Sequence, residues 1–374
     1  MRNFPPTAIM KLRALLRFPF IFFFCLFAAQ TALADSGSLQ ERAWKFLCEN
    51  MPEQDRGKVP EAYLRENCRL ALEVRDMPWS RDVPEEIFLN NVLPYSSVGE
   101  EVDAWRPLFR EKFMPLAANC KTATEVAETL NREIWKMLGV IYSPKRDKPD
   151  QSPFHSMRIG IASCSGLSII LVNACRSVGV PARFAGCRWK KKPGNHSWVE
   201  FWDCGKWHHI GAFDSPKAND TWFDPDAAAA VEDDPVYAVY AASWSKTGIL
   251  FKAVWRDDGD SRSPIPAYNV TARYVKKSVT SAEVSLGINL VDAAGKRVAL
   301  PVRIIDKKTK RVLAEGVTHD DKQDLNNHFT VVAPAGTVVE IYVCPANNSR
   351  EMLLGEHIFE SASKTIRLSF PQKR

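Results

Sequence analysis

The order of apolar and polar residues divides the chain into a helical part, a mixed part and a strand-rich part. From residue 39 to about residue 139 the sequence predicts helices, and Pro78 and Pro84 mark breaks between them. The segment Thr122-Ala123-Thr124-Glu125 has the spacing of a capping box, so a helix is expected to begin there. The clearest helices are expected at residues 41–50, 61–74 and 122–138.

Strict alternation of apolar residues begins near residue 279. The apolar residues from Val284 to Leu290 alternate with other residues, which is the period of a half-buried strand. Turn residues separate this strand from later ones, and the pattern predicts a small antiparallel β-sandwich. Such a domain would be a spacer or a binding module, with a plain structural appendage as the alternative. Further strands are expected at residues 302–305, 329–333, 338–343 and 365–370.

The middle of the chain contains a helix pattern followed by strand patterns. Cys164 begins the helix pattern, which has a buried apolar face, and Gly179 and Pro181 end it. His196 begins a strand pattern whose alternate residues should share one face of a sheet. The polar, proline-containing residues 142–156 are expected to form a loop that leads to the helix.

Cys164, His196 and Asp214 follow one another in an order that suits a nucleophile, its base and the acid that orients the base. A cysteine nucleophile is often held at a helix N-terminus, where unpaired N–H groups and the helix dipole stabilise a thiolate and a developing oxyanion. The backbone N–H of Cys164 is therefore the natural first donor of an oxyanion hole. Gln151 is a candidate for the second donor, with an ordinary loop residue as the alternative.

Three motifs surround these residues: Ser163-Cys164-Ser165-Gly166-Leu167-Ser168, Gly179-Val180-Pro181-Ala182-Arg183 and Asn195-His196-Ser197-Trp198-Val199-Glu200. They resemble the transglutaminase-like superfamily, a branch of the papain-like cysteine enzymes. The resemblance implies that Cys164 is the nucleophile, His196 the general base and Asp214 the orienting acid. One departure is Ala162, which stands where many relatives have glycine.

The acid has two candidates. Asp214 precedes Ser215-Pro216, whereas the usual acid of the superfamily precedes Pro-Thr, and Asp224 is a rival. We favour Asp214 because it follows the strand pattern of residues 206–213, the natural neighbour of the histidine strand. Asp224 follows the polar residues 215–220, which are typical of a loop.

Other residues that could carry chemistry have simpler interpretations. Cys175 lies on the helix of Cys164 but on a different side, so it is expected in the core. His208 and His209 point to opposite faces of a strand, and with His155 they form no zinc motif of useful spacing. We therefore expect no metal and no cofactor.

The first 34 residues have the parts of a secretory signal. A basic segment that contains Lys11 precedes the apolar residues 18–27, and Ala32-Leu33-Ala34 forms a cleavage site. The apolar run is too short for an ordinary transmembrane helix, and an uncleaved membrane anchor is the alternative. We expect cleavage after Ala34 and a secreted or periplasmic protein that meets the membrane only during export.

Charge and cysteine count limit the partners. Cleavage would remove four basic residues and no acid, which lowers the net charge from +6 to +2, so we expect no nucleic-acid partner. The run Lys190-Lys191-Lys192 is expected to be a solvated hairpin tip.

A free Cys164 leaves an odd number of other cysteines in the mature chain, so a complete disulfide framework is not implied. Asn195-His196-Ser197 is a glycosylation sequon, and a glycan there would block the histidine, so a bacterial source is expected.

These predictions combine into an α+β fold, with a papain-like transglutaminase core, an N-terminal helical region and a C-terminal antiparallel β-sandwich. We expect a cysteine-dependent acyl-transfer enzyme acting on amide bonds of proteins or peptides, through a thioester, with hydrolysis favoured over amine transfer. The alternative is an inactive scaffold or binding protein of the cell envelope, with an envelope or carbohydrate partner for the β-sandwich. The expected boundaries are 1–34 for the signal peptide, 35–120 for the helical region, 121–226 for the core, 227–278 for an extension and 279–374 for the β-sandwich.

Overall fold

A computed structural model of the chain describes residues 37–252, 264–275, 283–343 and 351–370. The described residues from Ser38 onward belong to one compact unit, Ser38–Arg374. The predicted signal peptide lies outside the described residues. Among the described residues, none of the helices combines the length and apolar character needed to cross a bilayer.

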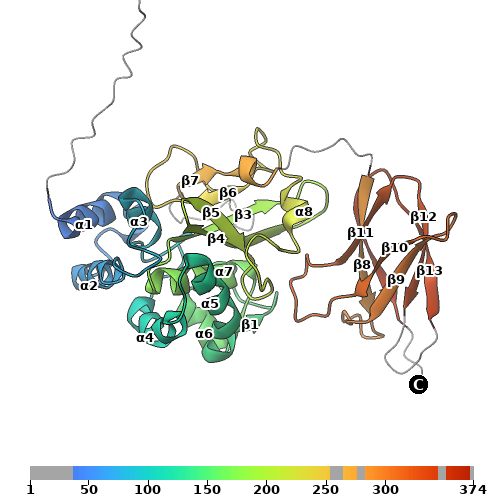
Figure 1. Cartoon of the computed structure of the whole chain (residues 1–374), viewed down its shortest axis with the longest axis horizontal. Coiled ribbons are helices and arrows are strands. Elements are labelled where there is room, and N and C mark those ends of the chain that lie inside the picture. Colours follow the sequence, from blue (N-terminus) through green and yellow to red (C-terminus); the bar gives the residue numbers. More distant parts are fainter. Residues whose placement is uncertain (1–36, 253–263, 276–282, 344–350, 371–374) are drawn as a thin grey trace, which may run out of the picture. The chain divides into compact units, whose positions relative to one another are not determined.

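The predicted α+β class is confirmed, and the N-terminal part is helical (Figure 1). The three helices that the sequence predicts most clearly are present as α1, α2 and α5. Ser38 forms a capping box with Glu41 at the start of α1, and the Thr122 side chain caps α5. The sequence did not single out α3 or α4, and α4 contains Pro115. The helices are α1 Leu39–Asn50, α2 Glu61–Leu72, α3 Glu85–Asn91, α4 Trp105–Ala117 and α5 Ala123–Leu138, with a 3-10 turn at Glu53–Asp55.

The centre of this unit is a five-stranded antiparallel sheet packed against the helix α7, Cys164–Ser177. Residues 165–177 of α7 are all buried, because the helix also contacts α4 and α5 (Figure 1). The strand order is β5-β4-β3-β6-β7. The strands are β3 Ala182–Arg188, β4 Asn195–Asp203, β5 Lys206–Ile210, β6 Tyr240–Ala242 and β7 Ala267–Asn269.

The segment before α7 is more ordered than the loop predicted at residues 142–156. It holds α6, Pro153–Ile159, and the strands β1, Ile141–Tyr142, and β2, Ile161–Ala162, which pair in parallel. The prediction failed because α6 is short and opens with a proline, which suits the first turn of a helix as well as a loop. The β1–β2 pair fixes the backbone immediately before Cys164.

The segment assigned to an extension, residues 227–278, contributes β6 and β7 to the central sheet. It follows the short helix α8, Asp224–Ala227, and ends in a 3-10 turn at Thr271–Arg273. The side chain of Tyr274 then donates to Glu200 at 2.9 Å, in the middle of β4. This segment is therefore part of the sheet that carries the histidine strand, while the exact domain boundaries stay predictions.

The C-terminal part consists of two sheets that pack around their own apolar core, as the alternating pattern predicts. One sheet has the order β10-β9-β12-β13 and the other β11-β8-β14. The second sheet is not purely antiparallel, because β14 pairs with β8 in parallel. The strands are β8 Glu283–Val291, β9 Pro301–Asp306, β10 Val312–Val317, β11 Phe329–Pro334, β12 Val338–Val343, β13 Met352–Ile358 and β14 Lys364–Ser369.

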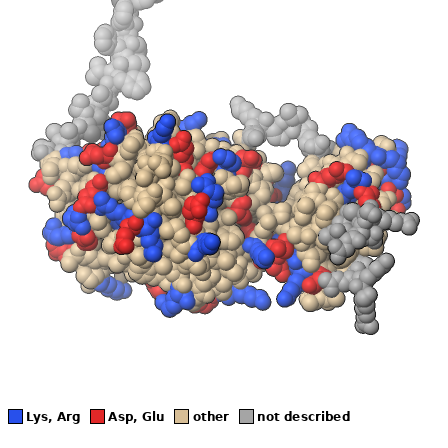
Figure 2. Space-filling model, turned by 60° about the horizontal axis from the view of Figure 1, so that its bottom comes forward, with Lys and Arg blue, Asp and Glu red and all other residues tan. Residues whose placement is uncertain are grey.

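Charges of both signs are interspersed over the face drawn in Figure 2. That face carries no broad field of one sign.

All seven cysteines within the described residues are free thiols, including Cys48 and Cys68, and Cys175 is buried as expected.

Candidate active site

Cys164 is the first residue of α7. Its N-cap, Ser163, makes no capping hydrogen bond with its side chain, which instead accepts one from Arg146 Nε at 3.0 Å. The first N–H groups of α7 are therefore free of side-chain capping, and the positive end of the helix dipole lies at the thiol. Cys164 is half-buried, whereas the rest of the helix is buried.

His196 is the second residue of β4, where it pairs with Cys187 of β3. Its ring is enclosed by aromatic side chains, and only 3% of the residue is exposed. The centroids of Trp222 and Phe223 lie 4.6 and 4.9 Å from the imidazole centroid. These contacts fix the plane of the ring without using its nitrogens, and neither nitrogen makes a hydrogen bond within the described part of the chain.

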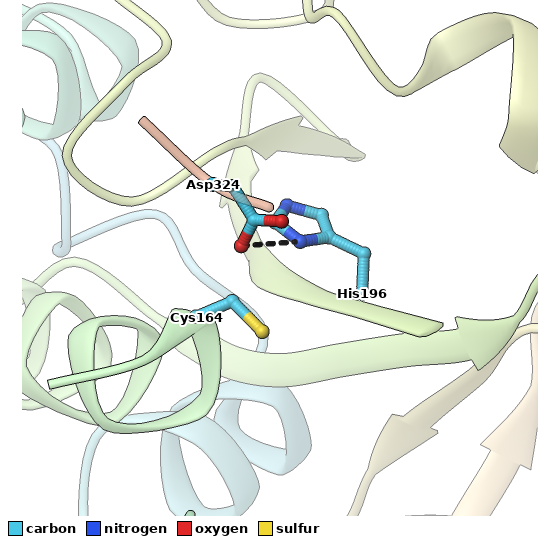
Figure 3. Close-up of side chains that lie close together, drawn as sticks. All are labelled: Cys164, His196 and Asp324. Atoms are coloured by element: carbon cyan, nitrogen blue, oxygen red, sulfur yellow. Dashed lines mark ion pairs between the residues drawn. The ribbon is translucent and has the colours of Figure 1, made fainter. Parts of the chain in front are cut away.

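The structure brings Cys164 and His196 together, as the sequence predicts, and adds Asp324. One potential ligand atom from each of the three residues lies within 4.8 Å of those of the other two. The His196 Nδ1 to Asp324 Oδ2 distance is 3.5 Å, so this contact is an ion pair and not a short hydrogen bond. Figure 3 shows the thiol, the imidazole and the carboxylate turned toward one another.

Asp214, the predicted acid, is not part of this cluster. Its carboxylate accepts a hydrogen bond from Trp222 Nε1 at 2.9 Å and one from Ser215 Oγ at 3.3 Å. Trp222 packs on the imidazole of His196, so its indole links the acid to the histidine indirectly. Burial raises the pKa of Asp214 to about 6, although the charge of His196 opposes this shift. Its role in orienting the histidine stays a prediction.

Asp224, the rival acid, serves another histidine. Its carboxylate lies 2.7 Å from Nε2 of His209 and accepts a hydrogen bond from the Thr221 hydroxyl at 2.6 Å. Burial would raise the pKa of Asp224, but the hydrogen bonds from His209 and Thr221 outweigh it and lower the pKa. The preference for Asp214 over Asp224 rested on strand order, and the contacts of Asp224 give no reason to reverse it.

Asp324 is the residue that sequence reasoning missed. It lies in the loop between β10 and β11, and 2% of it is exposed. Burial would raise its pKa, but the interactions with His196 and the hydrogen bonds from Asn326 together outweigh burial and lower it. Burial likewise would lower the pKa of His196, yet Asp324, with a smaller contribution from Cys164, raises it to about 10. The two side chains therefore form a buried imidazolium–carboxylate pair at neutral pH.

The other candidates have structural contacts. The Gln151 amide nitrogen donates to the Ile161 carbonyl at 3.0 Å, in the segment before Cys164. His208 Nδ1 lies 2.8 Å from the Asn219 amide nitrogen, and no zinc cluster includes it within the described residues. Thiol, imidazole and carboxylate are donors that zinc accepts, so Cys164, His196 and Asp324 could hold it. A metal there would occupy the sulfur that the predicted nucleophile needs.

Comparisons with known proteins give one informative match. Residues 114–212 match the sequence profile described as the transglutaminase-like superfamily. No curated protein matches the chain.

Two solved structures have low similarity to the chain. A proposed cysteine protease from Cytophaga hutchinsonii has a TM-score of 0.28 at 16% identity, with 47% of this chain and 63% of that chain covered. The Bacillus anthracis TIE protein has a TM-score of 0.19 at 10% identity, with 52% of this chain and 30% of that chain covered. The chain thus spans less than two thirds of either structure, and neither TM-score supports a conclusion about activity.

The matched residues contain the Cys164 helix and the His196 strand, and the match ends before Asp214. The thiol and imidazole that the profile match spans are also the ones that the structure brings together. The chain therefore contains a domain of the transglutaminase-like superfamily.

Proposed function

We propose that the protein is an exported cysteine-dependent acyl-transfer enzyme that acts on amide bonds of proteins or peptides. The observation that carries this proposal is the Cys164 thiol at the N-terminus of α7, beside the buried imidazole of His196. A thiolate in this position, beside a protonated imidazole, can attack an acyl carbon. The superfamily match supports the same chemistry.

The proposed reaction has two stages. In the first, the Cys164 thiolate attacks the amide carbonyl, and the proton held by His196 passes to the leaving amine, which leaves a thioester on the sulfur. The backbone N–H of Cys164 is the proposed first donor to the oxyanion. In the second stage, water attacks the thioester and releases the acid, while an amine in place of water would give transfer. We favour hydrolysis because water is always present.

Asp214 is the acid that we propose to orient His196. The orienting acid of a triad binds the imidazole nitrogen that faces away from the nucleophile. Asp214 is half-buried, its charge interacts with that of His196, and its carboxylate accepts a hydrogen bond from Trp222, which packs on the imidazole ring.

The proposal is tested by alkylation of Cys164 with iodoacetamide, followed by mass spectrometry, because this needs no known substrate. Cys204 serves as an internal reference because its thiol is exposed to the reagent. A hydrogen bond with Asp203 raises the pKa of this thiol, so it has no special activation. His196→Ala should slow alkylation of Cys164 by at least about tenfold and leave Cys204 unchanged. Equal rates at Cys164 in both proteins would contradict the proposal.

The second candidate is a non-catalytic scaffold of the cell envelope. One observation favours it: Asp324 lies against both the thiol and the imidazole, which a working site needs to keep free for a substrate. The same observation is also expected of an enzyme whose site is held closed until a substrate or partner opens it.

A further inference from the structure

The position of Asp324 differs from that of an orienting acid. In a triad the imidazole stands between the nucleophile and the acid, which places them roughly 7 Å apart, the length of the ring plus two hydrogen bonds. Here the carboxylate contacts His196 at Nδ1, and a carboxylate oxygen lies within 4.8 Å of the Cys164 sulfur. Figure 3 shows the carboxylate and the thiol on the same side of the ring. Asp324 therefore occupies the space in which a substrate carbonyl would meet the thiol.

The loop that carries Asp324 has a defined internal structure. It runs from Thr318 to His328, and the buried side chain of Arg297 lies at its centre. The Arg297 guanidinium also pairs with Asp321 at 3.2 Å. In all, the Arg297 guanidinium donates five hydrogen bonds to the loop, one to the Asp321 carboxylate and four to backbone carbonyls. These bonds hold the loop, and Asp324 with it, in one conformation. The backbone carbonyls that accept from Arg297 belong to Asp320, Gln323, Asp324 and Asn327.

The same loop is hydrogen-bonded to the catalytic part of the chain on both sides of Asp324. The backbone N–H of Leu325 donates to the Tyr142 hydroxyl at 2.9 Å, and the Asn326 amide donates to the Asn195 carbonyl at 3.0 Å. Gly194 has a φ of 105°, and a Cβ there would lie 2.3 Å from Asn326 Oδ1. The chain next to His196 is thus shaped to accept the loop.

We propose that the Thr318–His328 loop is an autoinhibitory plug that inserts Asp324 between Cys164 and an incoming substrate. The inference rests on the proposed function, because a plug has meaning only for a reactive thiol. In the closed state the carboxylate neutralises the imidazolium and covers the side of the ring that would exchange a proton with the sulfur. A substrate or partner must displace the loop before the thiol can react.

The test compares alkylation of Cys164 in the full chain and in Asp324→Ala. A plug that is closed nine-tenths of the time leaves about a tenth of the molecules reactive, so its loss should speed alkylation about tenfold. Lys322→Ala, at an exposed position of the same loop, is the matched control and should leave the rate unchanged. Asn326→Ala, which loosens the loop but keeps the carboxylate, is a second variant should Asp324→Ala fold poorly, and it should also raise the rate.

A rate that is unchanged or lower in both loop variants would overturn the plug, and a lower rate would instead make Asp324 an activating acid. The failure of the proposed function has a different signature. It would appear as a Cys164 rate that His196→Ala does not alter, with Asp324 present or replaced by alanine. The four combinations of these two substitutions therefore separate the two proposals.

Discussion

At the scale of single residues, the site depends on one buried pair of opposite charges. His196 and Asp324 are 3% and 2% exposed, so water screens their attraction very little. Such a pair is costly to break from one side, because the remaining charge is left buried without a partner. The imidazole is therefore fixed in its protonated form as well as in its orientation.

This pair predicts a loss of stability at alkaline pH. The pKa of His196 rises from 6.5 to about 10 on folding, so the folded state holds more protons than the unfolded state between those values. The contribution is complete below pH 6.5 and is lost as the pH rises through 10. The free energy of unfolding, measured with urea between pH 6 and pH 10, should fall more steeply for the natural chain than for Asp324→Asn. Parallel curves would contradict the buried pair.

Substitution of the two candidate acids, Asp214 and Asp224, should slow the chemistry to very different extents. Asp214→Asn should slow the chemistry by a factor on the order of ten to ten thousand, because the imidazolium loses a charged acceptor. Asp224→Asn should have a much smaller effect, since Asp224 pairs with His209. The readout is alkylation of Cys164 in the Asp324→Ala background, where the plug does not mask the thiol. If only Asp224→Asn slows the reaction, the two acids exchange roles.

Sequence reasoning found Cys164 and His196 because each opens a regular element with a local motif. The Cys164 helix and the His196 strand are readable from residues within one turn or a few positions. Asp324 gives no such signal, because it sits in a polar loop and its partner lies far away along the chain. Its contact with His196 depends on how the whole chain folds, and the local pattern of apolar and polar residues does not indicate such a contact.

At the scale of elements, the place of His196 depends on close packing between β3 and β4. Gly186 of β3 lies opposite Ser197, and a Cβ there would come within 2.7 Å of the His196 carbonyl oxygen. The backbone oxygen cannot move aside as the end of a flexible side chain can. The absence of a side chain at Gly186 is therefore what lets β3 and β4 lie this close together.

Gly186→Ala should therefore displace the histidine strand. We expect a loss of about 1–3 kcal/mol in the free energy of unfolding and slower alkylation of Cys164. The matched control is Gly355→Ala in β13, where a Cβ would meet nothing within 4 Å. Urea unfolding and the alkylation rate test both variants, and equal effects would show that the tight contact at Gly186 does not matter.

The elements themselves were predictable where their pattern is long. The helices α1, α2 and α5 and the alternating strand β8 carry their period over many residues. The prediction missed α6, which has seven residues, and β6 and β7, which have three each. Elements of that length are held by their neighbours and leave too few residues to show a period.

At the scale of the whole molecule, the β-sandwich has an apolar core of its own. Leu286 and Ile288 from one sheet face Ile304 and Ile341 from the other, and this cluster is distinct from that of the catalytic part. The sandwich should therefore fold when separated from the rest of the chain.

Residues 279–374 expressed alone should give a β-type circular dichroism spectrum and a cooperative thermal transition, because the described strands already close a two-sheet core. A strongly helical spectrum, or no transition, would contradict an independent β-sandwich.

The place of Asp324 along the chain has a consequence for the order in which the protein is made. Synthesis runs from the N-terminus, and N-terminal parts generally fold first. Cys164 and His196 therefore leave the ribosome well before the residues that cover them. A chain cut short before residue 318 would keep its thiol and imidazole but would lack the loop that covers them. Incomplete copies of the protein would therefore have an open site that the loop does not inhibit.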